Sequence, residues 1–161
     1  MAPNERVFGR ESKNRLSEAA APGLEGAQAA LETFYFSFNN RSIETLRQVW
    51  RNDGFIQLNN PLGGIIRGIE GITGLYDRVF NGPARVWVEF YDIMEYISGD
   101  MAVFAGRERG EFSKGGVVIP LAIRTTRVFK YTQDSGWRQV HHHGSIDDAK
   151  LLDEYQKAVR G

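Results

Sequence analysis

Residues 116–146 decide the fold, and they read GVVIPLAIRTTRVFKYTQDSGWRQVHHHGSI. The first half of this stretch is rich in β-branched and aromatic residues, and positions 133–136 supply turn residues. The pattern therefore predicts two long strands joined by a tight turn. The second strand ends in three consecutive histidines. Because successive strand residues point to opposite faces of a sheet, His141 and His143 share one face and His142 takes the other.

The first half of the chain carries helical periodicity. Apolar residues recur at three- and four-residue spacing over 24–38 and over 69–80, which predicts two amphipathic helices. Ser42 is placed to cap a short helix between them. Residues 55–58 predict a short strand, and the Asn-, Pro- and Gly-rich stretch 59–68 predicts a loop.

Beyond residue 84 the periodicity changes to two. Residues 85–97 and 101–112 predict two long strands joined by a Ser-Gly-Asp turn. Ser145 followed by Asp148 matches a capping box and predicts a last helix. Helices and strands are segregated along the chain, so the sequence predicts an α+β fold. We expect a strongly curved antiparallel sheet that wraps around the N-terminal helices as a cone-shaped barrel, with a C-terminal helix.

Composition narrows the class of protein. The chain has 161 residues, 42% of them hydrophobic, which suits one globular domain. Lys and Arg total 20, and Asp and Glu also total 20, so nothing favours binding to nucleic acid or to an anionic membrane. The first residues lack the apolar run that a secretory signal needs, and no apolar stretch approaches ~20 residues. We expect a cytoplasmic domain over 23–161, preceded by a flexible polar tail over 1–22.

Several motifs together resemble a known family. They are Ile66-Arg67-Gly68, the Gly99-Asp100 turn, Thr126-Arg127-Val128 and the stretch GWRQVHHHGS over 136–145. These motifs resemble a SnoaL-like domain, a branch of the nuclear-transport-factor-2-like superfamily close to the association domain of calcium/calmodulin-dependent kinase II. The resemblance extends from about Leu24 to Ile146. The superfamily hosts isomerases, dehydratases, cyclases, epoxide hydrolases and non-catalytic binding modules, so the resemblance specifies a fold more sharply than an activity.

The resemblance also implies where a site lies. It implies a pocket between the helices and the concave sheet face, and a homodimer formed through the outer sheet face. Arg107 and Arg127 match arginines that reach into the pocket of the kinase association domain and bind acidic groups. Gln57 and Asn59 fall where some relatives carry acidic pocket residues, and the full residue set of ketosteroid isomerase has no counterpart here.

Two histidines and one aspartate are the catalytic candidates. His143 and His141 combine a pKa near ~6.5 with a shared strand face, which suits a general base and its neighbour or two pocket-lining polar groups. His142, on the other face, is predicted at the surface or at an interface. Asp92 interrupts an apolar strand face, so it is either an acid or base with a raised pKa or a bulge residue that reaches water.

The remaining candidates are ligand-binding side chains. If Arg107 and Arg127 face the pocket, each needs an anionic ligand or an internal Asp or Glu partner, because an unpaired buried charge is costly. The alternative is that both arginines form cross-strand ion pairs on a solvated face of the sheet. Tyr35 and Trp50 are predicted as core aromatics that also form pocket walls. Two histidines at i and i+2 supply only two ligands, so we expect no metal site.

Two functions are compatible with these patterns. The first is a cofactor-independent isomerase or lyase that moves a proton on an apolar carbonyl compound, with His143 or Asp92 as the proton carrier. The second is a binding or association module whose arginine-lined pocket holds a carboxylate-bearing ligand. The enzyme requires an isolated titratable group with a strongly shifted pKa, whereas the module requires inward arginines that are already paired.

Overall fold

The computed structural model describes residues 3–161, and its centre is one six-stranded sheet with the strand order β2-β1-β6-β5-β4-β3. The strands are β1 (Gln57–Asn59), β2 (Ile65–Arg67), β3 (Arg85–Ser98), β4 (Met101–Lys114), β5 (Val117–Thr132) and β6 (Gly136–Ser145). The helices are α1 (Leu24–Asn39), α2 (Ile43–Val49), α3 (Gly68–Asn81) and α4 (Ala149–Arg160), with a short 3₁₀ helix at Leu16–Ala20.

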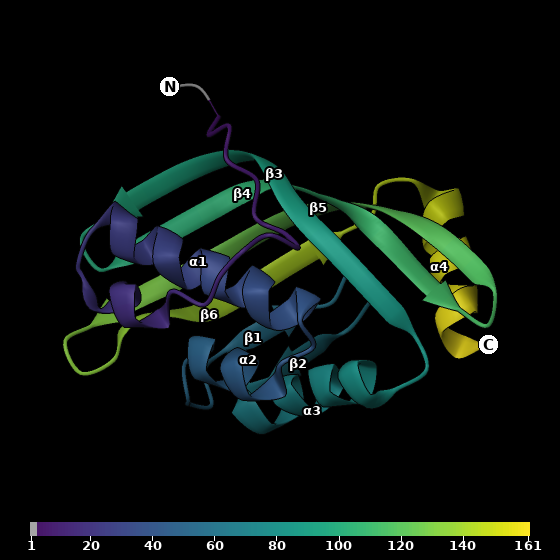
Figure 1. The fold of residues 1–161 in the computed structure, drawn as a ribbon, viewed down its shortest axis with the longest axis horizontal. Coiled ribbons are helices and arrows are strands. Elements are labelled where there is room, and N and C mark those ends of the chain that lie inside the picture. The colour runs from purple at the N-terminus through teal and green to yellow at the C-terminus, as the bar shows by residue number, and fades with distance from the viewer. Residues whose placement is uncertain (1–2) are drawn as a thin grey trace.

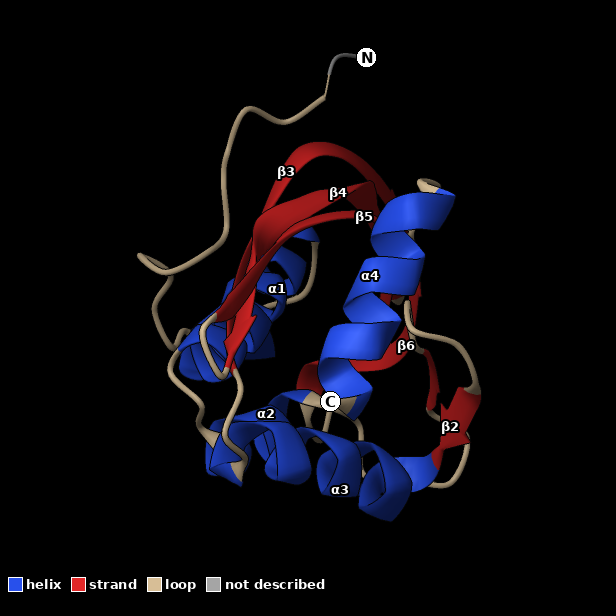
Figure 2. Cartoon of the chain, turned by 90° about the vertical axis from the view of Figure 1, so that its right-hand side faces the viewer, coloured by secondary structure: helices blue, strands red, loops and turns tan. Residues whose placement is uncertain are grey.

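The four long strands β3 to β6 pair antiparallel in chain order, and β1 adds to β6 in parallel. Figure 1 shows α1 lying across one face of this curved sheet, with α2 and α3 continuing the helical layer. Figure 2 shows α4 running from the β5 side towards α3, across the open end of the curve. The predicted α+β fold is thereby confirmed, with a sheet that is curved and open.

The core lies between α1 and the concave sheet face. It is built from aliphatic and aromatic side chains, among them Leu31, Phe34, Phe90, Phe104, Phe129 and Trp137, all of which are almost fully buried. Each full burial of a large apolar side chain contributes roughly 1.5–3 kcal/mol. No helix within residues 3–161 is long and apolar enough to cross a membrane.

A β-bulge in β6 changes which histidines face inwards. Val128 of β5 pairs with His141, but the next residue, Phe129, pairs with Gln139, so Val140 is an extra residue on β6. Gln139 and His142 are therefore the buried residues on either side of the bulge. The prediction that His142 lies at the surface is wrong, because the bulge reverses the simple alternation of faces.

A second bulge lies in β3, between Tyr91 and Met94. Asp92 occupies it with a positive φ of 54° and an exposed side chain, while Ile93 is buried. The neighbouring strand accommodates the bulge only because Gly106 has no side chain. A Cβ at Gly106 would lie 2.7 Å from the carbonyl oxygen of Tyr91.

Local details differ from the sequence prediction at two places. The predicted loop 59–68 contains the strand β2, which pairs with β1 and extends the sheet. The last helix is capped by Asp148, whose carboxylate accepts hydrogen bonds from the backbone N–H groups of Lys150 and Leu151 at 3.0 and 3.1 Å. Ser145 instead ends β6. Asp148 is itself an effective N-cap, so it starts the helix without the capping box.

Of the segment predicted as a flexible tail over 1–22, residues 1–2 lie outside the described residues, and the rest contacts the domain at several positions. Phe8 forms a backbone bridge with Phe90 and is only 1% exposed. Tyr131 and Trp137 each donate a side-chain hydrogen bond to backbone carbonyls at Ala20 and Ala21. A buried aromatic residue in this segment therefore anchors it to the sheet.

Candidate functional site

A cavity of about 350 Å³ lies between the concave sheet face, α3 and α4. Most of its lining is aliphatic or aromatic, and includes Phe38, Leu58, Leu75, Val79, Val88, Phe112 and Leu121. Its volume lies within the range of about 300–1,000 Å³ that is common for small-molecule sites. The cavity is therefore large enough, and apolar enough, to hold a small organic molecule.

An ion pair crosses the inner wall of this cavity. Arg127 of β5 donates to the carboxylate of Glu108 on β4 at 3.1 Å, and the two side chains are only 2% and 4% exposed. The same guanidinium donates to the hydroxyl oxygen of Tyr35 at 2.9 Å and to the amide oxygen of Gln139 at 2.9 Å. Thr125 and Tyr35 donate to Glu108 at 2.9 and 2.5 Å. Arg127 thus reaches the cavity with its charge already compensated.

Burial and charge both act on this network. Burial disfavours the charged guanidinium, but the neighbouring Tyr35, Glu108 and Tyr76 outweigh it and raise the pKa of Arg127. Burial is also the main cause that raises the pKa of Tyr35 well above its usual value. Arg127 is therefore a permanent cation and Tyr35 a permanent hydrogen-bond donor. Because the pair is nearly dry, removing either charge leaves the other uncompensated.

His142 is the unpaired polar group of the cavity. It lies directly opposite Arg127 in the β5–β6 register and is 4% exposed. Neither of its ring nitrogens has a hydrogen-bond partner among the described residues. Burial lowers the pKa of His142 well below 6.5, and the positive charge of Arg127 lowers it further. The imidazole is consequently neutral at physiological pH, with one N–H and one lone pair available inside an apolar cavity.

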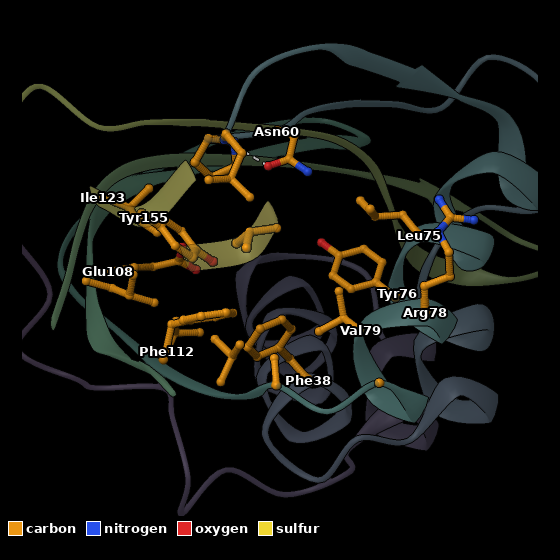
Figure 3. A pocket seen from close by; sticks show the side chains of 18 of the residues that line it. Phe38, Asn60, Leu75, Tyr76, Arg78, Val79, Glu108, Phe112, Ile123 and Tyr155 are labelled. Carbon is orange, nitrogen blue, oxygen red and sulfur yellow. Dashed lines mark hydrogen bonds between the residues drawn. The ribbon is translucent and has the colours of Figure 1, made fainter. Parts of the chain in front are cut away.

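Two tyrosine hydroxyls also belong to the polar lining. Figure 3 shows Tyr76 on α3 with its hydroxyl directed into the cavity, on the side opposite Glu108. Tyr155 enters from α4 and packs its ring against Phe112. Burial is the main cause that raises the pKa of each hydroxyl to about 12. Both tyrosines therefore stay protonated and can donate a hydrogen bond to an oxygen of a bound molecule.

His141 and His143 lie on the outer face of the sheet and do not line the cavity. Nδ1 of His141 is 2.8 Å from the carbonyl oxygen of Gln57, and Nδ1 of His143 is 3.1 Å from the side-chain nitrogen of Asn59. Gln57 also donates to Asn59 at 2.8 Å and accepts from Arg67. The structure thus brings four predicted site residues together, but as a polar cluster outside the cavity.

The other predicted site residues separate into surface and core. Arg107 pairs with Asp92 at 3.1 Å on the outer face, where both side chains are exposed. This is the solvated pairing that the sequence left as an alternative, although with a different partner. Tyr35 and Trp50 are buried, and neither lines the cavity. Among the predicted residues, only Arg127 lines it.

Sequence reasoning missed seven polar residues of the cavity lining: Asn60, Tyr76, Arg78, Glu108, Lys114, His142 and Tyr155. The two tyrosines lie on the apolar faces of the predicted helices. A residue with a hydroxyl group on such a face was the signal that could have identified them as cavity residues. His142 was misplaced because no residue type marks the bulge at Val140. No group of three or more His, Asp or Glu side chains in residues 3–161 is arranged to hold a metal ion.

Comparison with known proteins agrees with this architecture. Residues 27–149 match the model of a family described as a SnoaL-like domain. No curated protein matches the chain.

Solved structures share the fold. The chain is 25% identical to a candidate calcium/calmodulin-dependent protein kinase type II association domain from Thiobacillus denitrificans, with a TM-score of 0.61 over 73% of this chain and 92% of that one. A candidate dehydratase of the NTF2-like family from Streptomyces avermitilis is 22% identical, with a TM-score of 0.65 over 76% and 94% of the two chains.

A third solved structure extends this set. A ketosteroid isomerase-like protein from Erwinia carotovora atroseptica is 20% identical, with a TM-score of 0.62 over 74% of this chain and 92% of that one. The names of these proteins indicate different activities, whereas all three share the fold described above. The family model covers most of the chain, so the chain belongs to the SnoaL-like domain family and has the NTF2-like fold.

Proposed function

We propose that this protein is a cofactor-independent isomerase or lyase that moves a proton on a small apolar carbonyl compound bound in the cavity. The observation that carries the proposal is His142, a neutral imidazole that is buried in the cavity without a hydrogen-bond partner among residues 3–161. An unpaired buried polar group costs about 1–3 kcal/mol. A bound molecule that meets His142 recovers part of that cost.

The surrounding groups suit the steps of such a reaction. The lone pair of His142 takes the proton from the carbon beside the carbonyl, the C–H electrons form the C=C bond of an enolate, and the imidazolium returns the proton to a different carbon. Tyr76 and Tyr155, which are both protonated, are the available donors to the enolate oxygen.

Two of the similar structures bear names of this reaction type, a ketosteroid isomerase-like protein and a candidate dehydratase. Those names belong to those proteins, and at 22% and 20% identity they support a shared fold. The assignment of proton transfer to this chain rests on its own cavity. His142 replaces His143, His141 and Asp92 as the proposed proton carrier, because those three residues lie outside the cavity.

One observation favours a second candidate, a binding module without turnover. The cavity arginine, Arg127, is already paired with Glu108 and has side-chain partners at Nε and at both terminal nitrogens. A complete network of this kind stabilises a cavity wall and performs no chemistry. In this alternative His142 only orients the ligand by one hydrogen bond.

Exchange of carbon-bound hydrogen with deuterium in heavy water separates the two functions. The probe is α-tetralone, a bicyclic aromatic ketone whose exchange at the carbon beside the carbonyl is followed by NMR. We expect the wild type to accelerate exchange in a saturable manner over buffer. His142→Gln should lose this acceleration, because it keeps a polar side chain but removes the base.

The matched control is His143→Gln, the same substitution one residue further along β6 on the outer face. It should leave the exchange rate unchanged. Binding of α-tetralone without any accelerated exchange would establish the binding module in place of the enzyme. Loss of exchange in His143→Gln with retention in His142→Gln would contradict the assignment of His142, and absence of binding would contradict the cavity as a site for such ketones.

A further inference from the structure

The cavity has two cationic residues at one edge of its lining, Arg78 on α3 and Lys114 at the end of β4. The residues that follow α3, at 82–84, also line the cavity and lead into β3. Arg85 at the start of β3 pairs with Ser113, the neighbour of Lys114. The strand register therefore brings the ends of α3 and β4 to the same side of the cavity.

Neither of these two cations pairs with an Asp or Glu side chain in the part of the chain that the structure describes. Arg78 is exposed and forms no ion pair there. Lys114 donates to the backbone oxygens of Val159 and Gly161 at 3.2 and 2.8 Å. The only acidic residue of the lining is Glu108, which is occupied by Arg127. The cavity lining thus has excess positive charge at its edge.

The inner part of the cavity is a poor place for an anionic group. A carboxylate beside Arg127 would also meet the buried Glu108, and it would lose its hydration. At the edge, Arg78 is exposed, so a carboxylate there keeps water contacts and meets an arginine that is free to bind it. An apolar body that extends inwards from that head group meets the aliphatic and aromatic lining, to which His142 also belongs.

We propose that the molecule bound in this cavity is an amphipathic oxo-carboxylate. Its carboxylate is held by Arg78, with Lys114 beside it, and its carbonyl lies at the far end of the apolar body, at His142. This inference rests on the proposed function for the position of the carbonyl. The edge cations themselves select the charge of the ligand, and this selection is independent of whether proton transfer occurs.

A matched pair of probes isolates the head group. Octanoate and 1-octanol share an apolar chain, and only octanoate carries a negative charge. We expect octanoate to bind the wild type more tightly than 1-octanol in calorimetric titrations, and this preference should weaken at high salt. Arg78→Gln should weaken octanoate binding about tenfold and leave 1-octanol binding unchanged, because one charge-assisted contact is lost.

Arg78→Lys and Lys130→Gln serve as controls. Arg78→Lys keeps the charge and should retain most of the preference for octanoate. Lys130→Gln removes one positive charge at the other end of β4, where Lys130 pairs with Met101, and it should change neither affinity. Retained binding of 1-octanol shows that each variant is folded.

The outcomes separate this inference from the proposed function. Equal affinity of the wild type for both probes, or an unchanged preference in Arg78→Gln, would overturn the role of the edge cations and leave proton transfer by His142 intact. Binding of neither probe would overturn the amphipathic class of ligand, while exchange on α-tetralone still tests the enzyme. A preference for octanoate without any exchange on α-tetralone would support the role of the edge cations in ligand binding and would contradict the proposed enzyme activity.

Discussion

The two faces of β6 place consecutive histidines in opposite environments. On the outer face, His141 and His143 belong to a hydrogen-bonded cluster with Gln57 and Asn59. On the inner face, His142 lies opposite the cation Arg127 and is buried without a hydrogen-bond partner in the described part of the chain. The same residue type is therefore a hydrogen-bonded polar group on one face and an unpaired polar group on the other. The difference arises from burial and neighbouring charge, which the residue type does not encode.

A similar contrast holds for the ion pairs of the two faces. Glu108 and Arg127 are almost fully buried, whereas Asp92 and Arg107 are 46% and 61% exposed. Water screens the outer pair, so its net contribution is small. The inner pair is not screened, so each partner depends on the other.

The predicted homodimer through the outer sheet face stays a prediction.

The largest expected effect comes from breaking the inner pair. Glu108→Gln should lower the free energy of unfolding by about 3–5 kcal/mol, because it leaves a buried guanidinium without a counter-charge. The double variant Glu108→Gln/Arg127→Met should cost less than the sum of the two single variants. Denaturant unfolding of the four proteins measures both quantities.

Asp92→Asn is the matched change on the outer face. It removes one carboxylate from an ion pair, and Asn tolerates the positive φ at this position. We expect a loss below about 1 kcal/mol. Equal losses for Glu108→Gln and Asp92→Asn would show that the two faces do not differ as described.

The next effect is on acid stability. Burial and Arg127 lower the pKa of His142 in the folded protein, so below pH 6.5 the unfolded chain binds a proton that the folded chain does not. Falling pH therefore favours unfolding, by up to about 1.4 kcal/mol per pH unit between 6.5 and the folded pKa, and above 6.5 the contribution is constant.

His142→Phe removes this titration while it keeps an aromatic ring in the cavity wall. Denaturant unfolding at several pH values should show that the wild type loses more stability than His142→Phe as the pH falls below 6.5. Parallel pH dependences of the two proteins would argue that His142 is not held neutral by the fold.

The smallest effects are expected on the outer face. His143→Ala, at an exposed position, should change the free energy of unfolding by about 0.5 kcal/mol or less. His141→Ala removes a hydrogen bond to the carbonyl oxygen of Gln57 and should cost about 1 kcal/mol. Both variants should leave ligand binding unchanged, and thermal shift with α-tetralone checks this. A loss of binding in either one would move the site to the outer face.

Much of the fold was predictable, because it depends on periodicity. The apolar spacing over 24–38 predicted α1, and the period-two pattern beyond residue 84 predicted the four long strands. Ser42 caps α2 as predicted, by accepting from the backbone N–H of Thr45 at 3.3 Å. These features are local, so a single sequence contains the information.

The site was less predictable, because it depends on two register shifts. An extra residue at Val140 turns His142 inwards, and the bulge in β3 turns Asp92 outwards. Neither bulge interrupts the strand composition, so alternation alone assigns the wrong faces. Arg127 was predicted to need an internal acidic partner if it faced inwards, and Glu108 is that partner. To identify Glu108 required the register between β4 and β5.

One measurement tests the contrast between the two faces directly. The chain has only three histidines, so their imidazole resonances can be assigned by NMR from the spectra of single His→Gln variants. On titration with α-tetralone at neutral pH, we expect the ring resonances of His142 to shift and saturate, while those of His141 and His143 stay unchanged. Shifts of His141 or His143 with an unchanged His142 would contradict the inner face as the functional one.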